Sequence, residues 1–275
     1  MRSRWGAALV CAAAVSLSFS ATANAERPTA RWFTNALAER VHDAGATGVR
    51  VGEEALNTEC PGVQSPGVSA AGCIVAPAGC TANFIFASGS TRYVGTARHC
   101  VDSIGQEVTM QVDTTTIAVV GTVSHMTSGE GVPGNDWALV RIDPAVASKW
   151  GVSPAVPVVG GPNGIYTGCD PTPVLHYGHG YGVAVAQGKV EGGLATNWNN
   201  EGFGWTGFGA PGDSGSPVVT AGGQAAGDFT HLIVDPTTYP GSTLAGTRIT
   251  KALSQFGVSL VNADGSLTGA AGTAC

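Results

Sequence analysis

Short apolar segments separated by turn residues make up most of the chain after residue 80. Each segment is rich in β-branched or aromatic residues, and Gly, Asn, Asp or Pro usually separates it from the next. The segments are residues 83–86, 117–120, 137–142, 183–185, 217–219 and 229–234. Many brief apolar runs punctuated in this way are typical of an all-β barrel or sandwich.

Two segments have the period of a helix instead. Phe33, Leu37 and Val41 recur every four residues, which predicts a helix over residues 31–43 with one apolar face. A second helix is predicted over residues 251–261. Elsewhere the composition favours strands, because 41 of the 275 residues are Gly. Each Gly inside a helix costs about 1 kcal/mol relative to Ala.

Residues 1–25 have the features of a secretory signal peptide. Two arginines precede an apolar run over residues 6–19, and the A-x-A pattern of residues 23–25 is a cleavage site. The run is too short for a membrane anchor, and no later segment is apolar enough to cross a bilayer. We therefore expect cleavage after Ala25, a secreted, extracellular protein, and no association with a membrane.

The next segment, residues 26–72, differs from the rest of the chain. From Gly45 to Ala71 it is rich in Gly, Pro, Ser and Thr and has no clear period. This composition predicts an N-terminal arm or a pro-segment. The body of the protein is then residues 73–275.

Charge and cysteine content each exclude a class of function. The formal net charge is −6, and removal of the signal peptide takes away two arginines and no acid. Phosphate binding needs clustered cations, so we do not expect nucleic acid as a partner. Six cysteines remain, which predicts three disulfides outside the cell. None of their spacings is C-x-x-C, so no metal site is expected. The six are Cys60, Cys73, Cys80, Cys100, Cys169 and Cys275.

The first motif with chemical meaning is T-A-R-H-C, residues 96–100. A histidine on its own is more often structural than catalytic. A cysteine beside it changes the interpretation, because a general base needs a fixed ring and a disulfide can fix it. His99 is therefore a candidate base. Four other histidines lack such a context and are predicted to be surface or structural residues: His42, His125, His176 and His179.

The second motif is N-D-W-A-L, residues 135–139, in which Asp136 opens an apolar strand. An exposed aspartate at a turn is the simpler interpretation. A carboxylate held at the edge of a core could instead accept a hydrogen bond from an imidazole and stabilise its protonated form.

The third motif is G-A-P-G-D-S-G-S-P, residues 209–217. Serine is a weak nucleophile until a base removes its proton and N–H groups stabilise the oxyanion. Glycines on both sides of Ser214 permit a sharp turn that exposes the hydroxyl. The same turn can direct the N–H groups of Gly212 and Ser214 toward one point.

Taken together, T-A-R-H-C, D-W-A-L and G-D-S-G-S-P resemble the motifs of the chymotrypsin/trypsin-like serine proteases, of the compact secreted bacterial type. The order His, Asp, Ser also matches that family. A further match is G-T-R-I-T, residues 246–250, followed by the late helix. The resemblance covers residues 73–275. It implies two six-stranded antiparallel β-barrels with a C-terminal helix.

The resemblance also implies a role for each motif residue. Ser214 is the nucleophile, His99 the base and Asp136 the residue that orients His99, with the N–H groups of Gly212 and Ser214 as the oxyanion hole. The implied activity is that of a serine endopeptidase acting on proteins or peptides. The family needs neither a cofactor nor a metal, and a monomer is expected.

Specificity residues are carried over by position. The family's pocket base falls on Phe208 and its pocket wall on Leu244, and neither can pair with a basic side chain. Cleavage after Lys or Arg is therefore disfavoured, and a small or medium apolar residue before the cleaved bond is expected. His231 leaves open a preference for an acidic residue. The strand that pairs with the substrate backbone is expected at Thr230, His231 and Leu232.

The resemblance places Cys80 and Cys100 on one hairpin, which implies a disulfide between them. The other four cysteines allow three pairings. Cys60–Cys73 together with Cys169–Cys275 is favoured, because the first of these pairs closes a short loop.

Two features depart from the family. Vertebrate members pair the aspartate before the nucleophile, here Asp213, with a new N-terminal amine. The nearest candidate, I-V-A-P at residues 74–77, lies too close to Cys80. We therefore expect an internal partner for Asp213, namely an arginine. In addition, Arg98 stands before His99, where it could pair with a carboxylate of the site or extend into solvent.

Two alternatives are weighed against the protease. A protease-like binding protein without activity would not require all three groups of the triad. An α/β-hydrolase needs G-x-S-x-G and the order Ser, Asp, His, whereas here the nucleophile comes last and a strand follows it.

Overall fold

The computed structural model describes residues 31–32, 67–129, 131–180, 189–210, 212–233, 239, 241–273 and 275. Several of the sequence predictions lie wholly or mostly outside these residues: the signal peptide, the helix over residues 31–43, the strand at 183–185, and the positions of His42 and Cys60.

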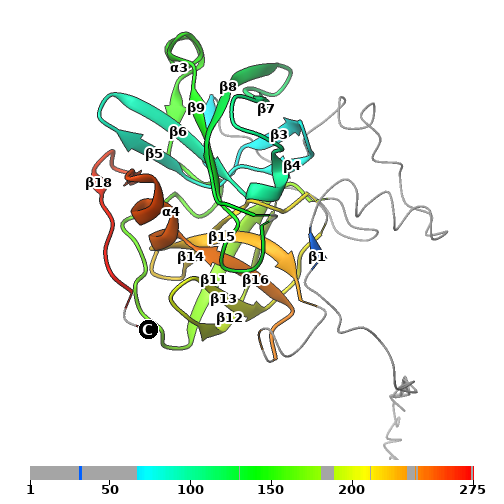
Figure 1. Cartoon of the computed structure of the whole chain (residues 1–275), viewed down its shortest axis with the longest axis vertical. Helices are drawn as coiled ribbons and strands as arrows, with labels where there is room; N and C mark the ends of the chain where they lie inside the picture. Colours follow the sequence, from blue (N-terminus) through cyan, green and yellow to red (C-terminus); the bar gives the residue numbers. More distant parts are fainter. Residues whose placement is uncertain are drawn as a thin grey trace, which may run out of the picture.

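Six antiparallel strands close into a barrel in the C-terminal half (Figure 1). Their order is β15-β14-β11-β12-β13-β16, and a direct pairing of β15 with β16 completes the ring. The fold class predicted for this half is therefore confirmed. The strands are β11 (Thr172–Gly178), β12 (Lys189–Trp198), β13 (Gly202–Thr206), β14 (Pro217–Thr220), β15 (Ala225–Leu232) and β16 (Leu244–Arg248).

The N-terminal half forms a second antiparallel sheet, with the order β18-β17-β5-β6-β9-β8-β7-β3-β4. No pairing that closes it into a ring is recorded among the described residues, so the second six-stranded barrel stays a prediction. The strands are β3 (Cys73–Ala76), β4 (Cys80–Thr81), β5 (Ile85–Ser88), β6 (Thr91–Thr96), β7 (Glu107–Gln111), β8 (Ile117–Met126), β9 (Ala138–Ile142), β17 (Ser259–Val261) and β18 (Leu267–Thr268).

Three short strands remain. β2 (Val68–Ser69) and β10 (Val152–Ser153) form a parallel pair. β1 (Arg31–Trp32) pairs antiparallel with the end of β15. The helix predicted over residues 31–43 is therefore wrong at its first two residues, because their backbone extends the barrel sheet instead; its remaining residues lie outside the described part of the chain.

Glycines allow β15 and β16 to approach where the barrel closes. A Cβ at Gly227 would lie 2.0 Å from the carbonyl oxygen of Thr247, and one at Gly246 would lie 2.1 Å from that of Asp228. Any side chain at these two positions would push the strands apart, so the high glycine content is used in part to close the barrel.

The core between the two halves contains aromatic side chains of the N-terminal half and aliphatic side chains of the barrel. Phe84 and Phe86 of the N-terminal half pack in one cluster with Trp137 and with Val219 of the barrel. Trp137 is fully buried, and its indole N–H donates to the carbonyl oxygen of Arg248 across the interface at 3.2 Å. Because Asp136 directly precedes Trp137, this anchor places the candidate carboxylate between the halves.

The late helix begins earlier and ends earlier than predicted. α4 spans Ile249–Phe256, and Gly257 ends it in the left-handed conformation with φ 64°. Residues 259–261, predicted to be its last turn, form β17 and pair with β5. Pairing with a distant strand overrides the local apolar period here, so the chain returns to the N-terminal sheet after the helix (Figure 1).

One helix was missed in the sequence. α3 spans Pro144–Trp150, and the Asp143 side chain caps it by accepting from the N–H of Ala145 at 2.7 Å. Asp followed by Pro is a recognised start signal, but only two turns of helix follow it.

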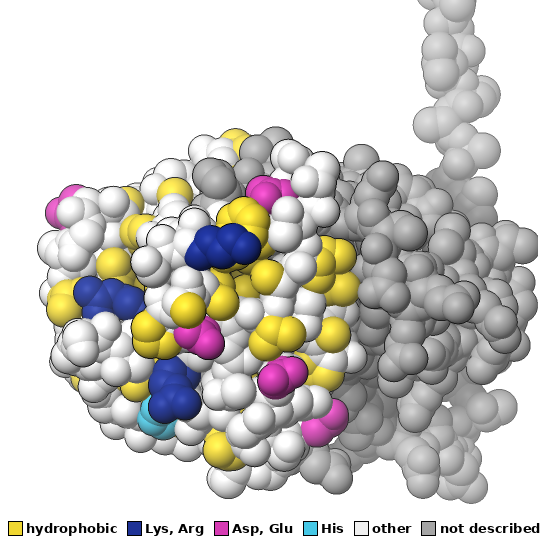
Figure 2. All heavy atoms as spheres, turned by 90° about the horizontal axis from the view of Figure 1, so that it is seen from above, with side chains coloured by type: hydrophobic (Ala, Val, Ile, Leu, Met, Phe, Trp, Pro, Cys, Tyr) yellow, Lys and Arg dark blue, Asp and Glu magenta, His cyan; other side chains and the backbone are white. Residues whose placement is uncertain are grey.

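Charged side chains are sparse on the surface. On the face shown in Figure 2, the Lys and Arg side chains lie singly among polar and apolar ones and form no patch. No helix in the described part of the chain has both the length and the apolar content needed to cross a bilayer.

Candidate active site

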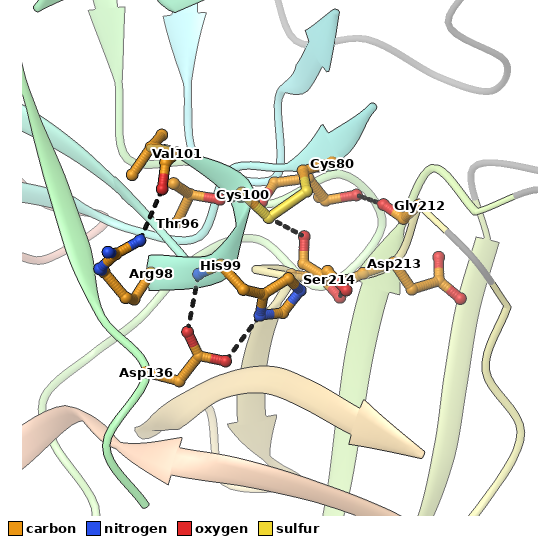
Figure 3. Close-up of a disulfide and its surroundings, with 12 residues drawn as sticks. Cys80, Thr96, Arg98, His99, Cys100, Val101, Asp136, Gly212, Asp213 and Ser214 are labelled. Atoms are coloured by element: carbon orange, nitrogen blue, oxygen red, sulfur yellow. Dashed lines mark hydrogen bonds and ion pairs between the residues drawn. A yellow bond between two sulfur atoms is a disulfide. The ribbon is translucent and has the colours of Figure 1, made fainter. Parts of the chain in front are cut away.

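His99 and Asp136 form a buried pair. The two oxygens of the Asp136 carboxylate accept from two different N–H groups of His99. The ring Nδ1 lies 2.7 Å from Oδ2, and the backbone N–H of His99 donates to Oδ1 at 3.0 Å (Figure 3). A carboxylate is an acceptor only, so Nδ1 carries the proton and the lone pair of the ring lies on Nε2.

His99 is held in place by its neighbours in sequence. It lies in a 3-10 turn, Arg98–Cys100, and the disulfide Cys80–Cys100 ties this turn to β4. The structure thus contains the disulfide that the resemblance implies. The Arg98 guanidinium donates to the carbonyl oxygen of Val101 at 2.7 Å (Figure 3). Of the two roles considered for Arg98, the structure therefore favours neither; its side chain closes the turn.

Asp136 is held from both sides by one threonine. The Thr127 hydroxyl donates to the carbonyl oxygen of Asn135 at 3.1 Å and accepts from the N–H of Trp137 at 3.2 Å. Burial alone raises the pKa of Asp136, but the electrostatic interaction with His99 and its two hydrogen bonds outweigh this effect. The net pKa is lowered, so this fully buried carboxylate is ionised.

Ser214 lies in a tight turn between Gly212 and Gly215, beside the imidazole of His99 (Figure 3). Both glycines have positive φ, 99° and 87°, which other residues rarely adopt. The carbonyl oxygen of Ser214 accepts from the N–H of Thr81 at 2.9 Å, and the N–H of Gly215 donates to Phe229 at 2.7 Å. The turn is thus fixed to both halves of the molecule.

The Asp213 carboxylate accepts from two backbone N–H groups, those of Gly180 at 2.7 Å and Ala210 at 2.8 Å. The arginine that we expected as its partner is not one of these two donors. Gly178 and Gly180 leave room for the carboxylate, since a Cβ at either would lie 2.1 to 2.6 Å from its nearest atom. These two glycines, in the segment of residues 177–180, therefore accommodate Asp213.

A second imidazole lies behind Asp136. His231 is fully buried, and its Nδ1 is 3.9 Å from Oδ2 of Asp136 and 2.6 Å from the Thr230 hydroxyl. That hydroxyl donates its only proton to the carbonyl oxygen of Ala245, so the ring must donate to it. Burial lowers the pKa of His231 to about 3, and the ring is neutral.

Asp228 is the functional-site residue that sequence reasoning missed. It is fully buried on β15, where its Oδ1 accepts from the N–H of Thr247 at 3.2 Å. Burial and the charge of Asp136 raise the pKa of Asp228 well above its ordinary value, so Asp228 is a neutral acid. One signal was visible: an aspartate inside an apolar strand segment.

The predicted specificity residues lie in different environments. Thr230, His231 and Leu244 are buried, Leu232 is partly buried, and Phe208 is 55% exposed. The register pairs Leu232 with Leu244.

An apolar floor underlies the segment that precedes Ser214. Leu244 and Phe229 lie close beneath Gly209, where a Cβ would meet both side chains. Neither side chain carries a charge that could pair with a basic substrate residue.

Of the four histidines that the sequence predicts to be surface or structural residues, three contribute to packing. His125 is partly buried against the rings of Tyr93 and Phe256. His176 is fully inside the barrel core, where burial lowers its pKa to about 4. His179 is buried, and its Nε2 lies 2.8 Å from the carbonyl oxygen of Ala71. His42 lies outside the described residues.

The remaining cysteines agree in part with the favoured pairing. Cys169 and Cys275 form a disulfide. Cys73 is also disulfide-bonded. Cys60, its favoured partner, lies outside the described residues.

No family model and no curated protein matches the sequence. Similar solved structures include Protease A of Thermobifida fusca, with 24% identity over 66% of this chain and 91% of that one, and a TM-score of 0.46. Chymotrypsin of Cellulomonas bogoriensis has 23% identity over 70% and 98%, and a TM-score of 0.48. A glutamic acid-specific serine protease that uses a histidine triad in substrate binding has 24% identity over 70% and 100%, and a TM-score of 0.47. Sequence identities this low do not assign a role to any residue of this chain.

The neutral state of Asp228 predicts a pH-dependent difference between the wild type and Asp228→Asn. The unfolded chain ionises at the ordinary value of 3.8, whereas the folded chain holds the proton to higher pH. The wild type therefore loses stability as the pH rises from 3.8 through the folded pKa. Asn cannot titrate, so the free energy of unfolding of the variant rises relative to the wild type over that window, by up to about 1.4 kcal/mol per pH unit.

Chemical denaturation between about pH 4 and about pH 8 measures this difference. Asp170→Asn, which removes an exposed acid, is the control. If the free energy of unfolding of Asp228→Asn instead falls relative to that of the wild type as the pH rises, Asp228 is ionised in the folded protein.

Proposed function

We propose that this chain is a secreted serine endopeptidase that cleaves peptide bonds through Ser214, His99 and Asp136. The observation that carries the proposal is the double contact of Asp136 with the ring and backbone N–H groups of His99, with Ser214 beside the same ring (Figure 3). Three side chains from three segments of the chain meet in one place between the two halves. A purely structural role would require none of these three chemical groups in particular.

The chemistry follows from the proton positions. Nδ1 of His99 donates to Asp136, so Nε2 is the atom that takes the proton of Ser214 as its oxygen attacks the carbonyl carbon of the substrate. Asp136 stabilises the imidazolium formed at that moment. His99 then returns the proton to the leaving amine, and water repeats the sequence on the acyl-enzyme.

The oxyanion of each tetrahedral intermediate is assigned to the N–H groups of Gly212 and Ser214. Support comes from the turn over residues 212–215, in which the N–H of Asp213 donates to the carbonyl oxygen of Ala210 and that of Gly215 to the carbonyl oxygen of Phe229. The φ of 99° at Gly212 permits this turn. One such donor typically lowers the barrier by about 3 to 4 kcal/mol.

For specificity we propose a small or medium apolar residue on the N-terminal side of the cleaved bond. The apolar pair Leu244 and Phe229 beneath Gly209 supports this preference. The strand Thr230, His231 and Leu232 is proposed to pair with the substrate backbone by adding a strand to the sheet.

Within residues 26–72, the part that precedes β2 is proposed to act as a pro-segment rather than only as an arm, because β2 and Ala71 belong to the buried core. β1 pairs with β15 in the register Arg31 with Leu232 and Trp32 with His231, which are two of the proposed substrate-pairing residues. Backbone groups bonded to β1 cannot at the same time bond to a substrate. This segment therefore has to leave β15 before a substrate binds there.

The triad proposal predicts covalent labelling at one serine. A fluorophosphonate should label the folded wild type at Ser214 in a one-to-one ratio, and Ser214→Ala should abolish labelling and lower kcat by about a million-fold. Intact mass and peptide mapping measure the label. Ser216→Ala, two residues away, should still be labelled. A folded wild type that takes no label would instead support a binding protein without activity.

The specificity proposal predicts the products from a peptide library. Cleavage should follow small and medium apolar residues and should not follow Lys or Arg, because no acid lies in the proposed pocket residues. Leu244→Ala should shift the preference toward larger apolar residues. Sequencing of the products, with Ser214→Ala as the blank, tests this; cleavage mainly after Glu would assign His231 the role of specificity residue.

The pro-segment proposal predicts faster labelling when β1 cannot pair. β1 is an edge strand, and replacing both of its residues with proline leaves it no N–H to donate to β15. The double variant Arg31→Pro/Trp32→Pro of the uncleaved chain should therefore react with the fluorophosphonate several-fold faster than the wild type. Ala270→Pro/Ala271→Pro, in an exposed segment outside the strands, is the matched control. Equal rates for all three chains would exclude an inhibitory role for β1.

A further inference from the structure

Thr81 connects the N-terminal half to the turn that carries Ser214. It lies on β4 directly after Cys80, in the half that also carries His99, and it is fully buried. Its partners on the turn are 131 or more residues away in the sequence. This residue was not singled out by any motif, because its neighbourhood in the sequence is an ordinary strand.

Every polar group of Thr81 is used. Its N–H donates to the carbonyl oxygen of Ser214 at 2.9 Å, and its carbonyl oxygen accepts from the Thr96 hydroxyl at 3.0 Å. Its hydroxyl donates to the carbonyl oxygen of Gly212 at 2.9 Å. The same hydroxyl accepts from the N–H of His179 at 3.0 Å.

The direction of the hydroxyl proton follows from these contacts. A backbone N–H cannot accept and a carbonyl oxygen cannot donate, so the hydroxyl accepts from His179 and its one proton goes to Gly212. The N–H of His179 thus aligns the hydroxyl toward a single acceptor.

Gly212 needs such a contact. It has no side chain, and at φ 99° it occupies a region that glycine enters and leaves easily. The hydroxyl of Thr81 selects one orientation of its carbonyl group, while the N–H of Thr81 holds the carbonyl group of Ser214 two residues later. Both ends of the turn that would bind the oxyanion are therefore held by the same residue.

We propose that Thr81 is a positioning residue, whose hydroxyl holds Gly212 in the conformation that directs the oxyanion-binding N–H groups at the substrate. The inference rests on the proposed function, since it assigns Thr81 a part in the same reaction. A residue in this role affects the transition state more than the bound substrate, because the oxyanion exists only after attack.

The test compares Thr81→Val with Thr81→Ser. Valine keeps the shape and removes the hydroxyl, whereas serine keeps the hydroxyl. We expect Thr81→Val to lower kcat on a peptide substrate by about 10- to 100-fold with little change in KM. The affinity for a peptide boronic acid, which forms a tetrahedral adduct with the serine, should fall in parallel. Thr81→Ser should stay within about threefold of the wild type in both measurements.

Thr220→Val is the matched control, because it removes another buried hydroxyl, one that accepts from the N–H of Gln224 away from the site. The thermal unfolding midpoint of each variant checks folding, and Thr81→Ala replaces the valine variant if that one does not fold.

Three outcomes would overturn the inference. They are an unchanged kcat in Thr81→Val, equal losses in the valine and serine variants, and a rise in KM with unchanged kcat. In each of these the wild type is still active, so the proposed function stands. A folded wild type that neither turns over a peptide nor takes the fluorophosphonate label overturns the proposed function itself, and this inference with it.

Discussion

The candidate site depends on one ionised carboxylate that is completely withdrawn from water. Burial on its own would favour the neutral form of Asp136, and two N–H groups of a single histidine reverse that preference. Because both donors belong to His99, the contact fixes the position of the ring, its tautomer and the charge of the acid together. Two neighbours maintain this state. Asp228 is neutral and adds no second negative charge beside Asp136, and His231 is neutral and does not compete with His99 as a cation.

The two halves of the molecule meet through directed polar contacts as well as through the aromatic core. The indole of Trp137 donates to Arg248, and Thr81 donates to Ser214 and Gly212. Each contact involves a candidate catalytic residue or a residue one or two positions from it in the sequence. A small rotation of one half against the other would break these bonds, so the relative position of base and nucleophile is coupled to the packing of the whole interface.

The sequence was informative where chemistry is encoded in adjacent residues. The motifs around His99, Asp136 and Ser214, and the cysteine beside His99, could be found without a structure, as could most of the strand segments. It was uninformative where a residue's partner is distant. Thr81 is an ordinary strand residue until the turn at Gly212 lies against it, and the partner expected for Asp213 was an arginine although backbone N–H groups fill two of its acceptor positions. The end of α4 was misplaced for the same reason, because pairing of residues 259–261 with β5 cannot be seen in a local apolar period.

The disulfide between Cys169 and Cys275 encloses all six strands of the closed barrel, and Ser214 with them, in one covalent ring. A single hydrolysed bond anywhere inside this ring would leave both fragments attached to each other. If the chain is exported and cleaves proteins as proposed, it would therefore survive a first nick by other hydrolases or by its own copies as one connected molecule. Such damage would be invisible on a non-reducing gel and would appear only after the sulfur–sulfur bond is reduced.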